Sequence, residues 1–85
     1  MNPRKAAPPA SLFATNVAAA LHALLTDRGI SDAEIARRIG RSQNYVSSRF
    51  RGDGSFTLSD VDAIARDLGI DAGSFLAGVS RRLGI

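Results

Sequence analysis

The segment from Arg41 to Arg51 is rich in amide, hydroxyl and guanidinium side chains. An amide or a guanidinium can form two parallel hydrogen bonds with the edge of a nucleic-acid base, and an arginine also binds phosphate. This chemistry predicts a surface that contacts double-stranded DNA. We expect base contacts from Gln43 and Asn44 foremost, together with Tyr45, Ser47 and Ser48, and phosphate contacts from Arg41, Arg49, Arg51 and Arg38.

Two short helices are expected to carry these side chains. Ser31 can accept hydrogen bonds from the free amides of a first helical turn, and Glu34, three residues later, completes the pattern of a capping box. A helix is therefore predicted from about Asp32 to Gly40, a residue that adopts the left-handed conformation without steric cost. Its apolar face consists of Ile35, Ala36 and Ile39, of which the small alanine allows a second helix to approach closely.

The second helix follows this turn almost at once. Ser42 is its predicted cap, and Val46 and Phe50 repeat at the i, i+4 spacing that points both side chains inward. The amide and hydroxyl groups are left on the other faces, and several of them lie at the start of the helix. In a helix-turn-helix, that end of the second helix meets the base edges of the major groove.

This spacing resembles the helix-turn-helix of the lambda-repressor-like, or XRE, family, which includes phage repressors and Cro proteins. The matching positions are Ala36, Gly40, Ser42, Val46, Phe50 and Gly52. The stretch TLSDVDAIARDLGI, from Thr57 to Ile70, is similar to the fourth helix of the family, so the resemblance covers roughly Ser11 to Leu76. It implies a compact all-α domain of five helices, with the helix-turn-helix at the second and third, and sequence-specific DNA binding.

One position departs from the family pattern. The family usually has glutamine at the first position of the first motif helix, where it supports a phosphate contact, and this chain has Asp32 there. A carboxylate close to a phosphate is unfavourable, so we do not expect Asp32 to make that contact. It is suited instead to the positive end of the helix dipole.

Outside the motif, the sequence predicts one arm and three further helices. Residues 1–10 contain all three prolines and have no apolar period, so we interpret 1–10 as a flexible basic arm and 11–85 as one DNA-binding domain. Helices are expected from Ser11 to about Arg28, from the Thr57 cap to Gly69, and from Asp71 to an end that Gly78 obscures. The expected inward-facing residues are Leu12, Phe13, Val17, Ala20, Leu21, Leu24 and Leu25 in the first of these helices, and Leu58, Val61, Ile64, Ala65 and Leu68 in the second.

The charges are distributed unevenly along the chain. The 85 residues carry a net charge of +3, but the segment 28–52 has six arginines against two acids and the segment 53–76 has five aspartates against one arginine. We therefore predict one basic face that attracts a polyanion and one acidic face that repels it. Such binding should weaken steeply with salt, because each neutralised phosphate releases counterions.

Composition limits the other classes of function. With 85 residues the chain forms one small domain, and without cysteine it has no disulfides and no thiolate metal site. The single His22 lacks partners for a metal, no apolar run approaches the roughly 18 residues of a membrane span, and the first ten residues are too polar for a signal peptide. We expect a soluble, cytoplasmic protein with no catalytic residues, cofactor, metal, membrane contact or small-molecule substrate.

Each assignment has a structural alternative. The amide and serine side chains can simply face solvent, the tyrosine can pack over a neighbouring turn rather than stack on DNA, and any single arginine can belong to a solvated face. Arg37 or Arg38 can pair with Glu34 at helical spacing. Arg4 and Lys5 of the arm can follow the minor groove or remain disordered. A further apolar set can form a two-fold dimer contact or pack within one subunit: Phe75, Leu76 and Val79.

The resulting hypothesis is a sequence-specific DNA-binding transcriptional regulator of the repressor type. It would act by occupying an operator as a homodimer, with two recognition helices one duplex turn, about 34 Å, apart on a pseudo-palindromic site. The alternative is an antitoxin or another protein-interaction module that uses the same fold, a role that the acidic fourth helix favours.

Overall fold

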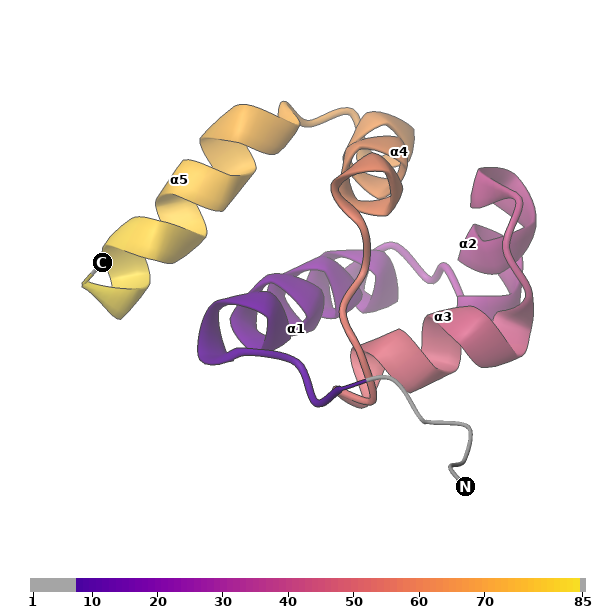
Figure 1. Cartoon of the computed structure of the whole chain (residues 1–85). Coiled ribbons are helices and arrows are strands. Elements are labelled where there is room, and N and C mark those ends of the chain that lie inside the picture. The colour runs from indigo at the N-terminus through magenta and orange to yellow at the C-terminus, as the bar shows by residue number, and fades with distance from the viewer. Residues whose placement is uncertain (1–7, 85) are drawn as a thin grey trace, which may run out of the picture.

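Five helices make up the computed structural model, which describes residues 8–84. Figure 1 shows their order, and no strand occurs within 8–84. The helices are α1 Leu12–Asp27, α2 Asp32–Ile39, α3 Gln43–Phe50, α4 Leu58–Leu68 and α5 Ala72–Leu83. The prediction of an all-α, five-helix fold is confirmed. Most of the predicted arm, including Arg4 and Lys5, lies outside the described residues.

Local capping explains where each helix begins. A side chain directly before each helix accepts a hydrogen bond from the backbone N–H three residues later, at 2.8–3.1 Å, and these caps are Ser11, Ser31, Ser42, Thr57 and Asp71. Gly40 and Gly69 end α2 and α4 in the left-handed conformation, both with φ of 75°. The predicted starts of α2, α3 and α4 are therefore confirmed, since they depend on contacts within a few residues.

Of the two hydrogen bonds in the capping box predicted at the start of α2, one forms and the other does not. The Ser31 hydroxyl does accept from the Glu34 amide, but the Glu34 carboxylate does not return to Ser31 and is instead bonded by Arg37 and Arg38. The two guanidiniums, three and four residues further along the helix, offer charge-assisted bonds that a neutral amide cannot match. The complete capping box lies at the start of α4, between Thr57 and Asp60.

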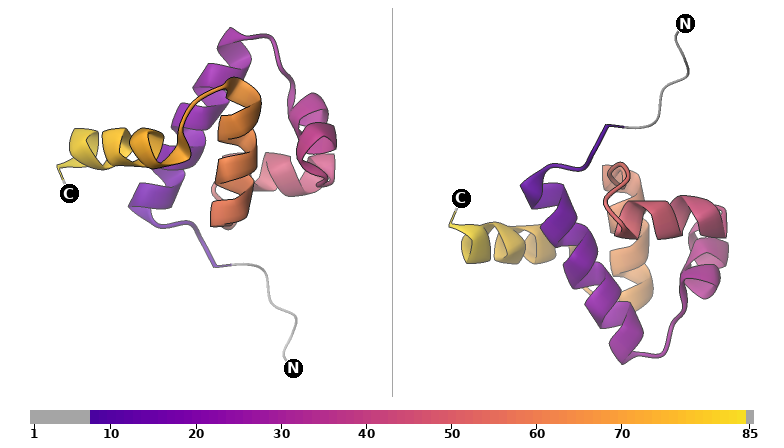
Figure 2. Two further views of the ribbon diagram at one scale, coloured as in Figure 1. Left: turned by 90° about the horizontal axis from the view of Figure 1, so that it is seen from above. Right: turned by 90° about the horizontal axis from the view of Figure 1, so that it is seen from below.

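The core lies where α1 crosses the other helices. Figures 1 and 2 show α5 on one side of α1 and the α2–α3 pair on the other, and α1 contacts α3, α4 and α5. The largest fully buried side chains come from all five helices: Leu21, Leu25, Ile35, Ile64, Val46 and Val79. Within 8–84, no helix is long and apolar enough to cross a bilayer.

Two predicted core leucines are not in the core. Leu12 is 71% exposed and Leu58 is 77% exposed, and each is the first residue of its helix. Helical periodicity identifies a face but does not say how far along the axis the neighbouring helices extend. The end of the last helix, which the sequence leaves open at Gly78, lies at Leu83, because α5 continues through the glycine.

These positions allow a matched test of the core. We expect Leu21→Ala to lower the free energy of unfolding by about 2–5 kcal/mol, because it removes a fully buried side chain. Leu58→Ala, the same change at an exposed position, should stay within about 0.5 kcal/mol of the wild type. Urea unfolding monitored by circular dichroism measures both values, and equal losses would contradict this placement of the two leucines.

Candidate nucleic-acid interface

The α2–α3 unit has the geometry of a helix-turn-helix. Ile35 and Ala36 of α2 and Val46 of α3 are buried in the common core, with exposures of 0%, 2% and 0%. Between the helices the chain turns at Gly40, and the Arg41 N–H donates to the Ala36 carbonyl at 2.9 Å. One face of α3 is thereby fixed against the rest of the domain, and the opposite face remains outside.

Gln43 and Asn44 occupy the outer face of the first turn of α3. Both are exposed, and neither side chain has a hydrogen-bond partner among residues 8–84. The backbone N–H groups of this turn lie at the positive end of the helix dipole, which favours the approach of an anion. These two side chains are therefore available to a partner outside the chain, as the sequence predicts.

The two serines of α3 are half-buried and already hydrogen-bonded. The Ser47 hydroxyl donates to the Asp32 carboxylate of α2 at 2.8 Å, and the Ser48 hydroxyl donates to the Tyr45 carbonyl at 2.8 Å. Each hydroxyl oxygen keeps acceptor capacity, but each proton is used within the domain. Their base contacts remain a prediction.

Tyr45 lies on the domain rather than projecting freely from α3. Its hydroxyl donates to the Asp60 carboxylate at 2.6 Å, and the guanidinium carbons of Arg41 and Arg49 lie 4.4 and 4.3 Å from its ring centroid. Its ring also meets the edge of Phe56, with centroids 6.3 Å apart. The hydroxyl therefore points toward α4.

The sequence predicts Asp60 only as part of a helix cap, and its contacts with α3 appear only in the fold. This carboxylate is only 4% exposed and accepts hydrogen bonds from Tyr45, from the Arg41 Nε at 2.9 Å and from the Thr57 amide at 3.1 Å. Burial alone would raise the pKa of Asp60, but these hydrogen bonds outweigh it and hold the pKa below its usual value. The partners are 15 and 19 residues away in α3 and the turn before it, so no local pattern reveals them.

The predicted phosphate-binding arginines all have partners in the free protein. Arg38 pairs with Glu34 and with Asp67, the latter at 2.7 Å, and Arg51 pairs with Asp53 at 3.2 Å. Arg49 donates through one terminal nitrogen to the Ser48 hydroxyl, whereas its buried Nε has no partner among the described residues. Phosphate binding by these arginines remains a prediction, and it would require them to exchange or share these partners.

The prediction of separate basic and acidic faces is wrong. The α2–α3 arginines and the acids of 53–76 meet each other in pairs: Arg38 with Asp67, Arg41 with Asp60 and Arg51 with Asp53. Packing of α2 against α4 brings Arg38 and Asp67 together, and a linear charge count does not include this contact. Arg51 and Asp53, by contrast, are only two residues apart in the sequence. The acids of α4 that favour the interaction-module hypothesis are thus paired within the chain, including Asp62 with Arg66.

Asp32 connects three helices. It accepts from the Ser47 hydroxyl of α3, and its other carboxylate oxygen lies 3.4 Å from the His22 Nε2 of α1. The His22 ring packs on Phe50, with centroids 4.6 Å apart. Where the family usually has a glutamine, this chain therefore has a carboxylate that fixes α3 to α1 and α2.

Comparison with known proteins agrees with this geometry. The HTH_3 helix-turn-helix family matches residues 21–75, which is more than half of the chain. The chain belongs to this family. The matched region contains all of α2, α3 and α4 and the C-terminal part of α1, so it includes both helices of the motif. The predicted resemblance to the lambda-repressor-like helix-turn-helix regulators is thereby confirmed.

Individual relatives show the extent of the similarity. Repressor protein C of Rhizobium phage 16-3 is 41% identical over 51 residues, which are 60% of this chain and 19% of the repressor. The clp gene regulator ClgR of Corynebacterium glutamicum has a TM-score of 0.75 at 22% identity, over 89% of this chain and 81% of its own. The hypothetical transcription factor NHTF from Neisseria has a TM-score of 0.66 at 28% identity, over 89% and 86%. The chain thus spans about a fifth of the phage repressor.

The environment of Asp60 predicts acid sensitivity. Because folding lowers the pKa of Asp60, its stabilising contribution is complete above the usual value of 3.8 and is lost as the pH falls through the lowered pKa. We expect the wild type to lose stability between about pH 5 and pH 2 more steeply than Asp60→Asn. Chemical unfolding of both proteins across this range measures the difference, and parallel curves would contradict it.

Proposed function

We propose that this chain is a sequence-specific DNA-binding transcriptional regulator of the repressor type, which acts by occupying its operator. The observation that carries the proposal is the pair of exposed amides, Gln43 and Asn44, which have no partner within 8–84 at the start of the second motif helix. An amide side chain pairs with adenine through two hydrogen bonds in the major groove. The proposed function involves no catalytic step, and it locates the protein with the DNA, in the cytoplasm.

Phosphate contacts would complete the interface. Arg41 lies two residues before α3, Arg49 within it and Arg51 directly after it, and Arg38 lies in the last turn of α2. Arg38, Arg41 and Arg51 carry nitrogens that can bind phosphate while an internal acid orients the rest of the guanidinium, and Arg49 is held by the Ser48 hydroxyl instead. These contacts would set affinity and orientation, whereas the amides would set sequence preference.

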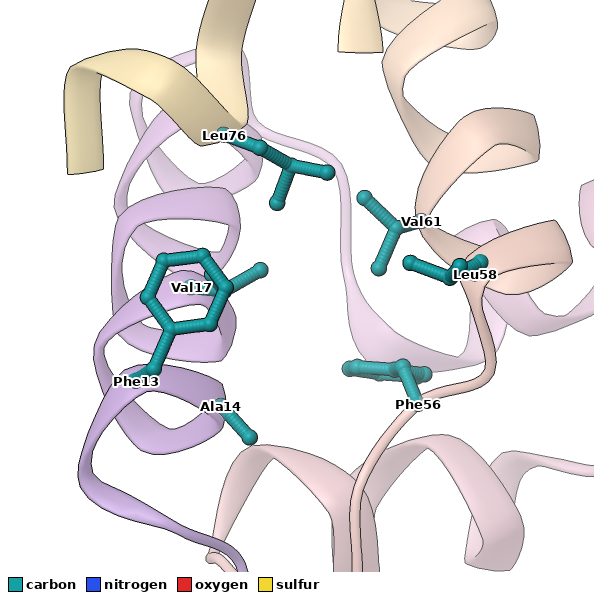
Figure 3. Close-up of a pocket in the computed structure, with 7 residues that line it drawn as sticks. All are labelled: Phe13, Ala14, Val17, Phe56, Leu58, Val61 and Leu76. Atoms are coloured by element: carbon teal, nitrogen blue, oxygen red, sulfur yellow. The ribbon is translucent and has the colours of Figure 1, made fainter. Parts of the chain in front are cut away.

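We further propose that the protein binds as a homodimer, and one apolar groove supports this. Figure 3 shows Phe13, Val17, Phe56, Leu58 and Leu76 around the groove, which lies between α1, α4 and α5. Leu76, predicted as a dimer residue, lines it together with the exposed Leu58, and the half-buried Phe75 lines a second hollow between α1 and α5. Val79, by contrast, is 2% exposed and belongs to the core of its own subunit, so it is not available to a partner.

Substitution of the amides tests the base contacts. We expect Gln43→Ala and Asn44→Ala each to weaken binding to the preferred duplex by about 1–3 kcal/mol and to leave binding to random duplex almost unchanged. Asn16→Ala is the matched control, because Asn16 is an amide on α1 whose side chain donates to the Leu12 carbonyl. Fluorescence anisotropy with both duplexes measures the effects, and equal weakening on both would contradict base contact.

Selection of DNA from a random pool tests the dimer. The expected product is a pseudo-palindrome whose half-sites are centred about 34 Å, or roughly ten base pairs, apart. Leu58→Glu and Leu76→Glu should weaken binding to the full site much more than to a single half-site, because they place charge in the groove. An asymmetric single site as the selected product would refute dimeric binding.

A further inference from the structure

Four side chains form a cluster that the proposed function leaves unexplained. This Tyr45 cluster consists of Arg41, Tyr45, Arg49 and Asp60. The two guanidinium carbons lie 4.4 and 4.3 Å from the centroid of the same aromatic ring. Arg41 precedes Tyr45 in the sequence and Arg49 follows it by one helical turn. One ring therefore contacts two cations, one from each direction along the chain.

Two cations at one ring repel each other, and Asp60 offsets this repulsion. Its buried carboxylate binds the Arg41 Nε at 2.9 Å and the Tyr45 hydroxyl at 2.6 Å. Burial and the hydrogen bond to Asp60 raise the pKa of Tyr45, in keeping with a phenol that donates to this carboxylate. The ring is consequently anchored to α4 at one end while its π-system holds the two arginines.

Stability alone does not account for the cluster. The Arg49 Nε is buried and has no hydrogen-bond partner among the described residues, an arrangement that lowers stability. Arg41 uses only its Nε in hydrogen bonds within 8–84, and Arg49 uses only one terminal nitrogen. The remaining terminal nitrogens of both arginines are available to an acceptor from outside the domain.

We propose that Tyr45 is a positioning residue that holds Arg41 and Arg49 together, so that the two bind backbone phosphates of DNA as a pair. This inference rests on the proposed DNA-binding function, and it replaces base contact as the role of Tyr45. A guanidinium that is already ordered by stacking on a ring loses less conformational freedom when it binds phosphate than a freely rotating one does. The cluster therefore supplies affinity and orientation, and sequence preference depends on Gln43 and Asn44.

Four variants separate positioning from direct contact: Tyr45→Phe, Tyr45→Leu, the double variant Arg41→Gln with Arg49→Gln, and the triple variant that adds Tyr45→Leu to it. The probes are a short duplex of random sequence and the duplex that the wild type selects from a random pool. Binding to each is measured as a function of KCl concentration, because the slope of log K against log salt reports the number of phosphates neutralised. Thermal unfolding shows which variants are folded.

The inference predicts a distinct result for each variant. Tyr45→Phe keeps the ring, so its affinity stays within about threefold of the wild type and its salt slope is unchanged. Tyr45→Leu and the double variant both lower the magnitude of the slope by about 1–2, since one or two phosphate contacts are lost, and both keep the wild-type base preference. The triple variant binds like the double variant, because Tyr45 acts only through the arginines.

Other results would overturn the inference while the proposed function stands. A changed base preference for Tyr45→Leu, or a further loss of affinity in the triple variant, would show that Tyr45 contacts DNA directly. An unchanged slope for the double variant would overturn it even if Tyr45→Leu does not fold. If the wild type binds neither duplex, the proposed function itself is refuted, and the role of the cluster with it.

Discussion

An eight-residue helix with one fully buried side chain cannot remain folded by itself, and everything on α3 depends on how its neighbours hold it. Val46 enters the core, and a polar contact on the neighbouring residue completes the attachment. The Ser47 hydroxyl donates to the Asp32 carboxylate on α2 at 2.8 Å. A half-buried hydrogen bond of this kind has strict geometry, so together with Val46 it defines the rotation of the helix about its axis. That rotation leaves the two amides of the first turn facing outward.

Carboxylates on α4 reduce the repulsion among the arginines of the motif when no DNA is bound. Arginines crowded around α2 and α3 would repel one another in the free domain, and Asp60 and Asp67 on α4 offset this repulsion. A phosphate that approaches Arg38 or Arg41 finds a guanidinium already oriented by its internal partner. These acids also make the net positive field weaker than the arginines alone would produce. Short-range contacts would therefore contribute more to DNA binding than long-range attraction.

The sequence predicts features that depend on near neighbours and fails where distant residues meet. The Ser42 and Thr57 caps, the Gly40 turn and the exposure of Gln43 all follow from patterns within one or two helical turns. The exposed Leu58 could not be foreseen, because only the packed fold shows where the neighbouring helices end. Likewise, the position of Tyr45 in α3 predicts a base contact, whereas its hydroxyl donates to Asp60, which is 15 residues away in the sequence.

The central claim is that the outer face of the first turn of α3 enters the DNA groove, and an NMR titration tests it most directly. The isotope-labelled protein is titrated with its selected duplex, and the side-chain amide signals of Gln43 and Asn44 are followed. We expect these signals to shift most and to acquire contacts to base protons, while the Asn16 side-chain signal stays in place. Shifts confined to α1 and α5, with unmoved Gln43 and Asn44 signals, would contradict it.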